Sequence, residues 1–495
     1  MLRARAYGWL NFLSAAMLLP LTVSFIPPQP AAAQLEARSS FNVGQAYPSS
    51  VAVGDFDRDG TLDAATVNFS ASSTVDILMG NSDGTFRLGQ TYPVPGSPFQ
   101  VIAASLRHNG LVDLVIAGGG SDNAVYVMLG NGDGTFQPAV PYPTTAESFM
   151  AALGDFTGSG NLDIVTIEGT SAQGVRCNCV EVLPGNGDGT FGAPVTTPVP
   201  YDIDGIAVAP GDFNNDGKLD VAVAGDYQVE ILLGNGKGAF SPDGYYAVSA
   251  TPQSIATGYF TSNKKKLDLA VANTEGESVS VLLGNGDGTF QQAVFYDVAS
   301  PPTWLIAQDM NGDGKLDLIT SNSGQPGELQ AYPPGVTVLD GNGDGTFQQG
   351  VFYPAGNAFD GNYVASGDFN GDHKPDLAFV DLDGSTVITL LNTGVASFSP
   401  TTPLNFQKQV VGTISKAKTV RLTNTGASEL KIQSMEASAE FAVTSTCGPR
   451  VAPGAQCTIH ATFAPTKKGA VQGTISIIDN ASSKPQVIEL LGDGT

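Results

Sequence analysis

The sequence predicts an all-β protein: a seven-bladed β-propeller followed by an immunoglobulin-like β-sandwich. Three observations lead to this prediction. Gly and Pro supply 60 and 31 of the 495 residues, while charged residues make up only 14%, which is typical of short strands joined by turns. An Asp-rich loop and a Gly-rich turn recur roughly every fifty residues, the signature of a repeat architecture. From residue 401 onward this repeat gives way to a different pattern of short strands.

Residues 1–33 have the features of a secretory signal peptide. Arg3 and Arg5 precede a mostly apolar run from Leu10 to Ile26, and small residues at 31–33 offer a cleavage site. A retained membrane anchor is the alternative. We therefore expect a secreted or cell-surface protein, exported as in bacteria, with no membrane insertion after signal removal. The formal net charge of −24 disfavours nucleic acid and anionic lipid as partners.

Residues 34–400 are assigned to the propeller because each repeat contains four strand-like runs. One run precedes the Asp-rich loop, one follows it, and two flank the Gly-rich turn. The turn reads Gly-Asn-Gly-Asp-Gly-Thr-Phe at 130–136, 185–191, 284–290 and 341–347, where Asn-Gly and Asp-Gly tolerate positive φ. Seven four-stranded units of this length match a seven-bladed propeller.

The two ends of the repeat region predict how the ring closes. No good fourth strand follows the run at 387–391. Residues 40–48 are similar to the fourth strand at 86–93, so we expect them to complete the seventh blade and remove an open sheet edge. Residues 396–400 are the competing candidate.

Four Asp-rich loops have the spacing of a calcium loop. Oxygen side chains stand at positions 1, 3, 5 and 9, position 7 offers a backbone carbonyl, and Gly at position 6 of three loops permits a sharp turn. Neither a Glu at position 12 nor flanking helical patterns are present, so these are not EF-hands. We expect about four Ca²⁺ sites. Their ligand positions are Asp55, Asp57, Asp59, Thr61 and Asp63; Asp212, Asn214, Asp216, Lys218 and Asp220; Asp309, Asn311, Asp313, Lys315 and Asp317; and Asp368, Asn370, Asp372, Lys374 and Asp376.

The other three repeats depart from the ligand pattern. The second has Arg107 at position 3, which opposes a cation, and the fifth has lysines at 264–266. Both are expected to hold no metal. The third keeps Asp155 and Asp163 with hydroxyl side chains between them, so it is an intermediate case.

The stretch Gly54-Asp-Phe-Asp-Arg-Asp-Gly-Thr-Leu-Asp63, together with the Gly-rich turns, resembles FG-GAP/VCBS repeats. These repeats build the propellers of integrin α-subunits and of many secreted bacterial proteins. The resemblance covers about 40–400. It implies a calcium-binding propeller, and it implies no particular ligand.

Residues 401–495 resemble a Hydin-type immunoglobulin-like domain, called choice-of-anchor D in bacterial proteins. The resemblance rests on the stretches 422–426, 446–448, 453–459 and 492–495, and it implies a spacer or interaction module. Cys447 and Cys457 lie ten residues apart, and we expect a disulfide. For Cys177 and Cys179, two thiols, a labile redox pair and a loop-stiffening disulfide all remain open, and the disulfide is preferred.

Propeller topology places the Asp-rich loops and the Gly-rich turns on one face, because strands alternate in direction. The opposite face carries the loops after strands two and four, where binding residues are expected. Candidate ligand-face aromatics are Phe99, Phe149, Tyr201, Trp304 and Tyr363. Packing between blades is the alternative role for them.

These features favour a secreted, calcium-binding, non-enzymatic binding or adhesion protein whose partner is an extracellular glycan or protein. The alternative is a calcium-dependent polysaccharide lyase or hydrolase on a propeller scaffold, and a purely architectural surface protein is a third possibility. The chain has three His, and neither Gly-x-Ser-x-Gly nor His-Glu-x-x-His occurs. No catalytic residue is therefore assigned.

Overall fold

A computed structural model describes residues 35–43, 47–69, 73–119, 123–170, 176–199, 207–324, 334–356, 361–371, 373–392, 396–399, 403–424, 430–438, 440–452, 454–479 and 486–495. Within these ranges all regular secondary structure is β-strand. No described segment forms a helix of the length and apolar character that crossing a bilayer requires. The predicted signal region lies outside the described residues.

The described strands of the repeat region form seven four-stranded units, as predicted. Blades one to three contain β2 (Pro48–Gly54), β3 (Asp63–Asn68), β4 (Thr74–Gly80) and β5 (Phe86–Pro93); β6 (Ser97–Ala104), β7 (Asp113–Gly119), β8 (Ala124–Met128) and β9 (Val140–Pro143); and β10 (Ser148–Gly154), β11 (Asp163–Thr170), β12 (Arg176–Leu183) and β13 (Val195–Pro198). One residue pair, Ser148 with Gly118, also joins the second and third units into one hydrogen-bonded sheet.

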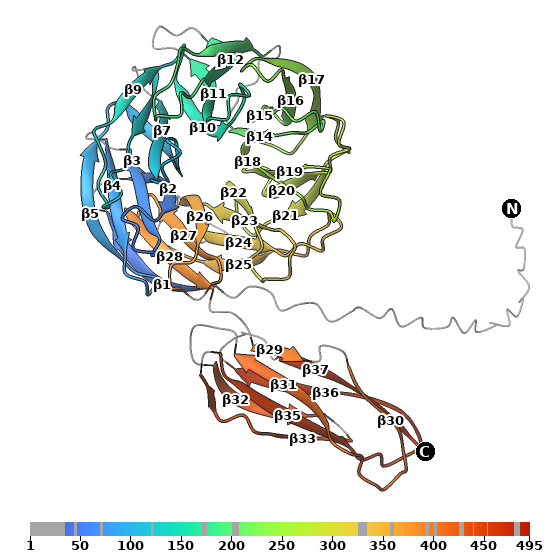
Figure 1. The fold of residues 1–495 in the computed structure, drawn as a ribbon. Coiled ribbons are helices and arrows are strands. Elements are labelled where there is room, and N and C mark those ends of the chain that lie inside the picture. The colour runs from blue at the N-terminus through green and yellow to red at the C-terminus, as the bar shows by residue number, and fades with distance from the viewer. Residues whose placement is uncertain are drawn as a thin grey trace, which may run out of the picture.

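The remaining blades repeat the same antiparallel order. They contain β14 (Ala207–Gly211), β15 (Asp220–Gly225), β16 (Gln228–Gly234) and β17 (Phe240–Ala247); β18 (Pro252–Gly258), β19 (Asp268–Asn273), β20 (Ser278–Leu282) and β21 (Val294–Asp297); β22 (Pro302–Gln308), β23 (Asp317–Asn322), β24 (Gly335–Leu339) and β25 (Val351–Pro354); and β26 (Gly361–Gly367), β27 (Asp376–Asp381) and β28 (Thr386–Asn392). Figure 1 shows the seven sheets arranged as a ring, with the first strand of each blade innermost.

The N-terminal strand closes the ring. β1 (Leu35–Asn42) pairs antiparallel with β28, so that the seventh blade has the order β1-β28-β27-β26. The closing strand therefore begins before the predicted range 40–48, and Pro48 already starts β2. Inner strand β26 contacts β2, which brings the first and last blades together.

The propeller core lies between neighbouring blades. The second and third strands of each blade are buried on both faces, which explains their nearly continuous apolar sequence. One buried cluster joins Ala222, Ile231 and Val229 of blade four to Leu269 and Val271 of blade five, and similar clusters fill the other seams. Burial of apolar surface in these seams is the main force that holds the ring together.

The C-terminal region is a sandwich of two sheets, as predicted. One sheet contains β29 (Ala396–Ser399), β31 (Lys418–Asn424), β35 (Gln456–Phe463) and β33 (Phe441–Ser445). The other contains β30 (Leu404–Gln409), β37 (Gln486–Gly494), β36 (Gly469–Asp479), β32 (Leu430–Ala437) and β34 (Arg450–Val451). Phe406, Phe441 and Phe463 pack together in its core.

Two details of this domain bear on the sequence predictions. Residues 396–399 pair with β31 and not with the propeller, so the competing candidate for the closing strand is wrong and the sandwich starts before residue 401. Cys447 and Cys457 form the expected disulfide, with Cα atoms 5.0 Å apart. Cys177 and Cys179 are also paired, which agrees with the preferred alternative.

Candidate metal loops and the opposite face

The first Asp-rich loop gathers three carboxylates. Ligand atoms of Asp55, Asp57 and Asp63 all lie within 4.8 Å of one another. The loop is held in this shape by its own backbone: the amide of Gly60 donates to Asp55 Oδ2 at 3.1 Å, and that of Thr61 donates to Asp59 Oδ1 at 2.7 Å. Gly60 has φ of 88°, a conformation that side-chain-bearing residues rarely adopt. The donor set is all oxygen, as a hard cation such as Ca²⁺ prefers.

The fourth and sixth loops repeat the backbone hydrogen bonds of the first, but among the described residues only the first loop brings three carboxylates within 4.8 Å of one another. Asp212 accepts from the amides of Asp216 and Gly217. Asp309 accepts equivalently from Asp313 and Gly314. The lysines at position 7 direct their ammonium groups at the position-5 carboxylates: Lys218 Nζ lies 2.9 Å from Asp216 Oδ2, and Lys315 Nζ lies 3.1 Å from Asp313 Oδ2. Only the backbone carbonyls of these lysines are candidate ligands.

The seventh loop is described except at one position. Asp368 accepts from the amides of Gly371 and His373. His373 occupies the position that Gly fills in the other three loops, and its φ of 65° is the left-handed conformation this turn demands. Asp376 accepts from the amide of Phe369, whereas the predicted ligand Asp372 lies outside the described residues.

The position-9 aspartate has a second role that sequence reasoning missed. In every blade it is buried, and it accepts one bond from the amide of loop position 2 and one from the residue that ends the third strand or starts the turn. For Asp63 the donors are Phe56 and Gly80, both at 2.8 Å. The seven equivalent residues are Asp63, Asp113, Asp163, Asp220, Asp268, Asp317 and Asp376. This clamp explains why the residue persists in loops that lack the other ligands.

Burial dominates the electrostatics of these clamps. It raises the pKa of Asp63 and of Asp220 to about 6, despite two backbone donors to each. Burial likewise raises the pKa of Asp317 to about 7, with smaller contributions from the charges of Asp340 and Asp309. A nearby cation would favour the ionised forms of all three carboxyl groups.

The second loop carries its own positive charge. The guanidinium of Arg107 donates to both oxygens of Asp113, at 2.5 Å and 3.1 Å, and to the carbonyl of Gly130 at 2.6 Å. Arg107 thus supplies positive charge directly to the clamp aspartate of a loop that lacks the other carboxylates. In the fifth loop the ammonium of Lys264 lies over the ring of Tyr259, 5.5 Å from the centroid.

Five of the seven loops accept a hydrogen bond from the Gly-rich turn of the next blade. The amide of Gly134 in blade two donates to the carbonyl of Phe56 in loop one at 3.0 Å, and the rings of Phe56 and Phe136 meet edge to face at 5.3 Å. The same amide-to-carbonyl bond joins Gly238 to Phe156, Gly288 to Phe213, Gly345 to Phe260 and Gly84 to Phe369. These loops therefore connect neighbouring blades.

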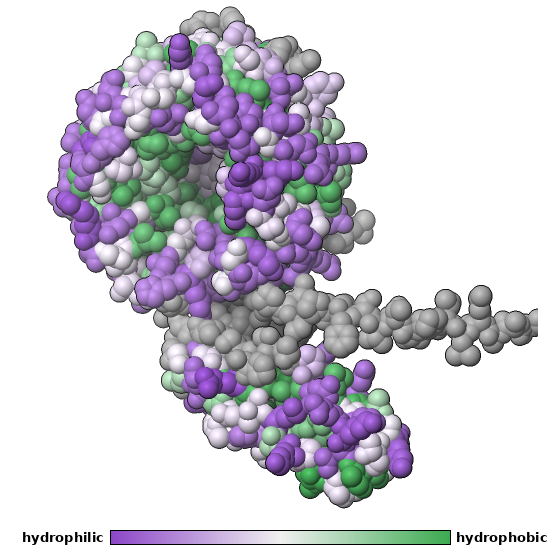
Figure 2. Space-filling model, turned by 45° about the vertical axis from the view of Figure 1, so that its right-hand side comes forward, coloured by the Kyte–Doolittle hydropathy of each residue, from purple (hydrophilic) through white to green (hydrophobic). Residues whose placement is uncertain are grey.

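Three of the five candidate aromatics meet at the centre of the ring. Trp304 and Tyr363 stack with centroids 4.0 Å apart, and Phe99 meets Tyr363 edge to face at 6.1 Å. The hydroxyl of Tyr363 donates to Met150 Sδ at 3.2 Å. Blades seven and three are not neighbours, so this contact spans the ring, and Figure 2 shows its hollow centre lined with apolar residues. The side chain of Phe149 and all of Tyr201 are outside the described set.

The exposure of this cluster is uneven. Tyr363 is buried, which raises its pKa well above the usual value. Phe99 remains 37% exposed. Most of the cluster therefore packs between blades, which agrees with the alternative role, and its contacts also reach across the centre of the ring. Phe99 is the member available for contact with a partner.

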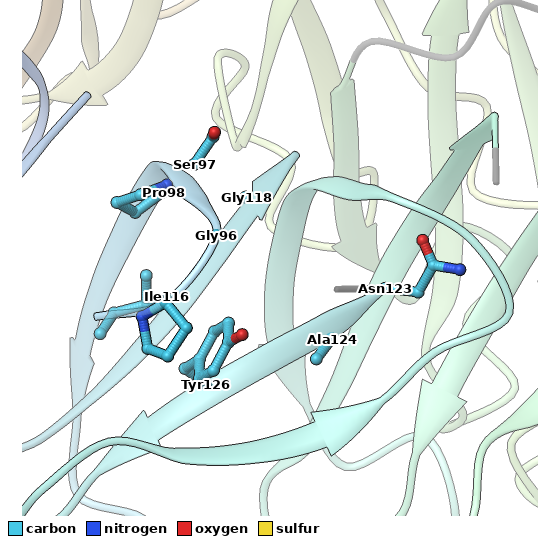
Figure 3. A pocket seen from close by; sticks show the side chains of 9 residues that line it. Gly96, Ser97, Pro98, Ile116, Gly118, Asn123, Ala124 and Tyr126 are labelled. Atoms are coloured by element: carbon cyan, nitrogen blue, oxygen red, sulfur yellow. The ribbon is translucent and has the colours of Figure 1, made fainter. Parts of the chain in front are cut away.

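A small pocket lies near Phe99 in sequence and was not anticipated. It has an empty volume of about 220 Å³ including its open mouth, and it is lined by Pro95, Gly96, Ser97, Pro98, Ile116, Gly118, Asn123, Ala124 and Tyr126. Ile116 and Tyr126 are cross-strand partners whose side chains share one face (Figure 3). The pocket is formed by the segment that enters blade two and by the end of its β7–β8 hairpin. It therefore belongs to the face opposite the Asp-rich loops.

The four-stranded units and their repeated Asp-rich loops define the fold as a β-propeller. The chain belongs to the FG-GAP-like repeat family, whose family model matches residues 106–166, 169–223, 212–266, 261–320 and 309–379. A second model, described as abnormal spindle-like microcephaly-associated, ASPM-SPD-2-Hydin, matches residues 393–487. Both matches agree with the resemblances drawn from the sequence. No curated protein sequence matches the chain.

Several solved propellers are distantly similar in structure. A lectin of Agrocybe aegerita, described as recognising non-reducing terminal N-acetylglucosamine, has 21% identity and a TM-score of 0.43 over 70% of this chain and 87% of that one. The periplasmic gluconolactonase PpgL of Pseudomonas aeruginosa has 13% identity and a TM-score of 0.45 over 68% and 88%. A putative 6-phosphogluconolactonase of Bacteroides uniformis has 13% identity and a TM-score of 0.45 over 62% of this chain and 86% of that one. What these proteins bind or hydrolyse does not pass to this chain.

Proposed function

We propose that this chain is an extracellular, calcium-stabilised binding protein without catalytic activity. Calcium in the loops of blades one, four, six and seven would join neighbouring blades. The opposite face would then bind an extracellular glycan or protein, and the sandwich domain would act as a spacer or second contact. The observation that carries the proposal is the convergence of Asp55, Asp57 and Asp63 within 4.8 Å in a loop that also grips the next blade.

The second blade supports a cation at this place. Its loop lacks the ligand set, and Arg107 supplies a guanidinium to the clamp aspartate instead. Burying a carboxylate without a compensating charge is costly, so a loop with several carboxylates and no Arg calls for a bound cation. Bound Ca²⁺ would supply positive charge and oxygen coordination. The chain's own residues position the oxygens and connect the loop to the neighbouring turn.

Calcium dependence is tested by thermal unfolding with saturating Ca²⁺ and with chelator. Binding to the folded state alone raises stability by mass action, so chelation is expected to lower the Tm reversibly. The Asp55→Asn variant is expected to bind one Ca²⁺ fewer by calorimetry. An exposed Asp in the turn of the same blade, changed by Asp83→Asn, provides the matched control. A Tm that ignores calcium at every concentration would refute the metal part of the proposal.

The binding face is tested separately. The protein and its Phe99→Ala variant are applied to a glycan array, with Phe295→Ala as control because Phe295 is equally aromatic, 53% exposed and located on the outer strand β21. Weaker binding of only the Phe99 variant would locate the ligand at the pocket face. Release of reducing or unsaturated ends from any polysaccharide would instead establish the lyase or hydrolase alternative.

Localisation outside the cell agrees with the two disulfides of the chain, since disulfides persist in oxidising compartments. Export is tested by expressing the full chain in a bacterial host and locating it by fractionation. Retention of the chain in the cytoplasm with reduced cysteines would contradict this part of the proposal.

A further inference from the structure

The fourth and sixth loops make an internal comparison. Their side chains are identical at positions 1, 3, 5, 7 and 9: Asp, Asn, Asp, Lys and Asp. They differ at the residue that precedes the glycine whose amide donates to the clamp aspartate. That glycine is Gly234 in blade four and Gly341 in blade six. Blade four has Leu233 there, and blade six has Asp340. The residues at this position in the other five blades are Met79, Leu129, Pro184, Leu283 and Leu391, so the acid is confined to blade six.

Asp340 lies beside the sixth loop and away from solvent. It follows the last residue of β24, and the next residue, Gly341, donates its amide to the clamp Asp317 at 2.8 Å. The side chain is 6% exposed, and its Oδ1 is buried without a hydrogen-bond partner. An unsatisfied carboxylate oxygen in such a position is unfavourable unless something positive approaches it.

The carboxylate interacts electrostatically with side chains of the sixth loop. Burial raises the pKa of Asp340 to about 6, and the charge of Asp313 raises it further. The amide of Asn311 and the charge of Lys315 act in the opposite direction. Asp340 therefore interacts with side chains at positions 3 and 5 of the loop, although it comes from another strand.

Lys315 does not account for the extra acid. Its ammonium pairs with Asp313, as Lys218 pairs with Asp216 in blade four, where no additional acid is present. Lys315 is therefore no stronger a counter-charge than its equivalent in a loop with one carboxylate fewer. The sixth loop with Asp340 carries four carboxylates, Asp309, Asp313, Asp317 and Asp340, against the three of the fourth loop.

We propose that Asp340 is an additional cation ligand, supplied from outside the loop, which makes the sixth loop the tightest Ca²⁺ site of the propeller. The inference rests on the proposed function, because it refines one of the proposed calcium sites. Ca²⁺ accepts six to eight oxygens, and its affinity rises with the number of charged ligands. Asp340 would supply a charged oxygen where the other blades have an apolar side chain or Pro.

The test is a pair of reciprocal substitutions followed by calcium calorimetry on the full chain. Asp340→Leu gives blade six the residue of blade four, and Leu233→Asp gives blade four the residue of blade six. Asp344→Asn is the matched control, because Asp344 is an exposed acid of the same turn that caps Thr346. Unfolding curves recorded in chelator verify that each variant is folded.

The wild type is expected to show one tight site and further weaker ones. Asp340→Leu should weaken the tight site by about tenfold or more, within the range for loss of a supporting metal contact, with the number of sites unchanged. Leu233→Asp should create a second tight site. Without calcium, Asp340→Leu should unfold at the same or a higher urea concentration than the wild type, because an uncompensated buried carboxylate has been removed.

Each outcome decides a different point. An Asp340→Leu isotherm that superimposes on those of the wild type and Asp344→Asn overturns the role of Asp340 and leaves the calcium proposal intact. A wild type that binds no Ca²⁺ overturns both. If Leu233→Asp fails to fold, the Asp340→Leu isotherm alone decides, because Leu is native at the equivalent position of four other blades.

Discussion

Removing the guanidinium from the second loop should destabilise the propeller in a way that calcium cannot repair. Arg107 makes three hydrogen bonds, two to Asp113 and one to the Gly130 carbonyl. Its side chain is 15% exposed and that of Asp113 is fully buried. In Arg107→Ala the carboxylate keeps only the amides of Leu106 and Gly130, and it loses its counter-charge.

The expected loss follows from that burial. Breaking a buried ion pair by deleting one partner typically costs about 3–5 kcal/mol. The lower end, about 3 kcal/mol, applies here because Asp113 retains two backbone donors and Arg107 has some contact with solvent. The loss should be the same in Ca²⁺ and in chelator, since Ser105 and Asn109 leave the loop without the carboxylates at positions 1, 3 and 5 that other loops offer.

Urea unfolding of the full chain, monitored by the fluorescence of Trp304 within the propeller, measures the effect. Arg87→Ala is the control, because Arg87 is an exposed Arg on the outer strand β5 and tests the loss of an Arg as such. Recovery of stability by added calcium would show that the loop binds metal after all. A midpoint equal to that of Arg87→Ala would refute the idea that Arg107 replaces a cation.

Two further predictions concern a buried acid and the closing strand. Glu230 is 1% exposed, neither of its carboxyl oxygens has a hydrogen-bond partner, and burial raises its pKa to about 7. The folded state therefore holds this proton more tightly than the unfolded chain, so stability should fall as pH rises from about 4.5 to 7, and Glu230→Gln should flatten that slope in urea midpoints taken at pH 5 and pH 8. Deletion of β1 leaves β28 as an open edge and removes the buried Leu35, so calorimetry should show a sharply lower Tm; an unchanged Tm would contradict ring closure by this strand.

The repeat pattern was sufficient for the fold because each blade is specified locally. Asn-Gly and Asp-Gly turns and alternating apolar runs fix strands and hairpins without knowledge of neighbours. Ring closure was predicted from a missing strand at one end and a surplus one at the other. The start of that strand at Leu35 was not predicted, because Leu35–Ser39 has no counterpart in the repeat.

Features that depend on contacts between blades could not be predicted from the sequence of a single repeat. The position-9 aspartate was interpreted only as a ligand, although its survival in the second and fifth loops was a visible sign of another task. Asp340 was overlooked because it stands outside the loop spacing, yet alignment of the seven repeats shows an acid where the others have apolar residues or Pro. The contact of Trp304, Tyr363 and Met150 joins strands from three blades, which no local pattern encodes.

The blade-to-blade bonds allow calcium to be assigned seam by seam. The amides of Gly84, Gly134 and Gly288 donate to loops seven, one and four, which have the calcium pattern, whereas Gly345 donates to the fifth loop, which lacks it. Each of the four amides lies at the same position of the Gly-rich turn in its own blade and makes the same hydrogen bond. They therefore differ chiefly in the loop whose carbonyl accepts that bond. Protection of an amide from hydrogen exchange reports the free energy of local opening.

Chelation should therefore accelerate exchange in the turns that contain Gly84, Gly134 and Gly288 and leave the turn of Gly345 unchanged. The clamp aspartates hold each hairpin without metal, so the strands themselves should keep their protection. Hydrogen exchange measured by mass spectrometry on peptides covering each turn, with and without Ca²⁺, tests this. Uniform acceleration in all four turns would mean that calcium acts on global stability alone, and it would contradict the assignment of calcium to individual seams.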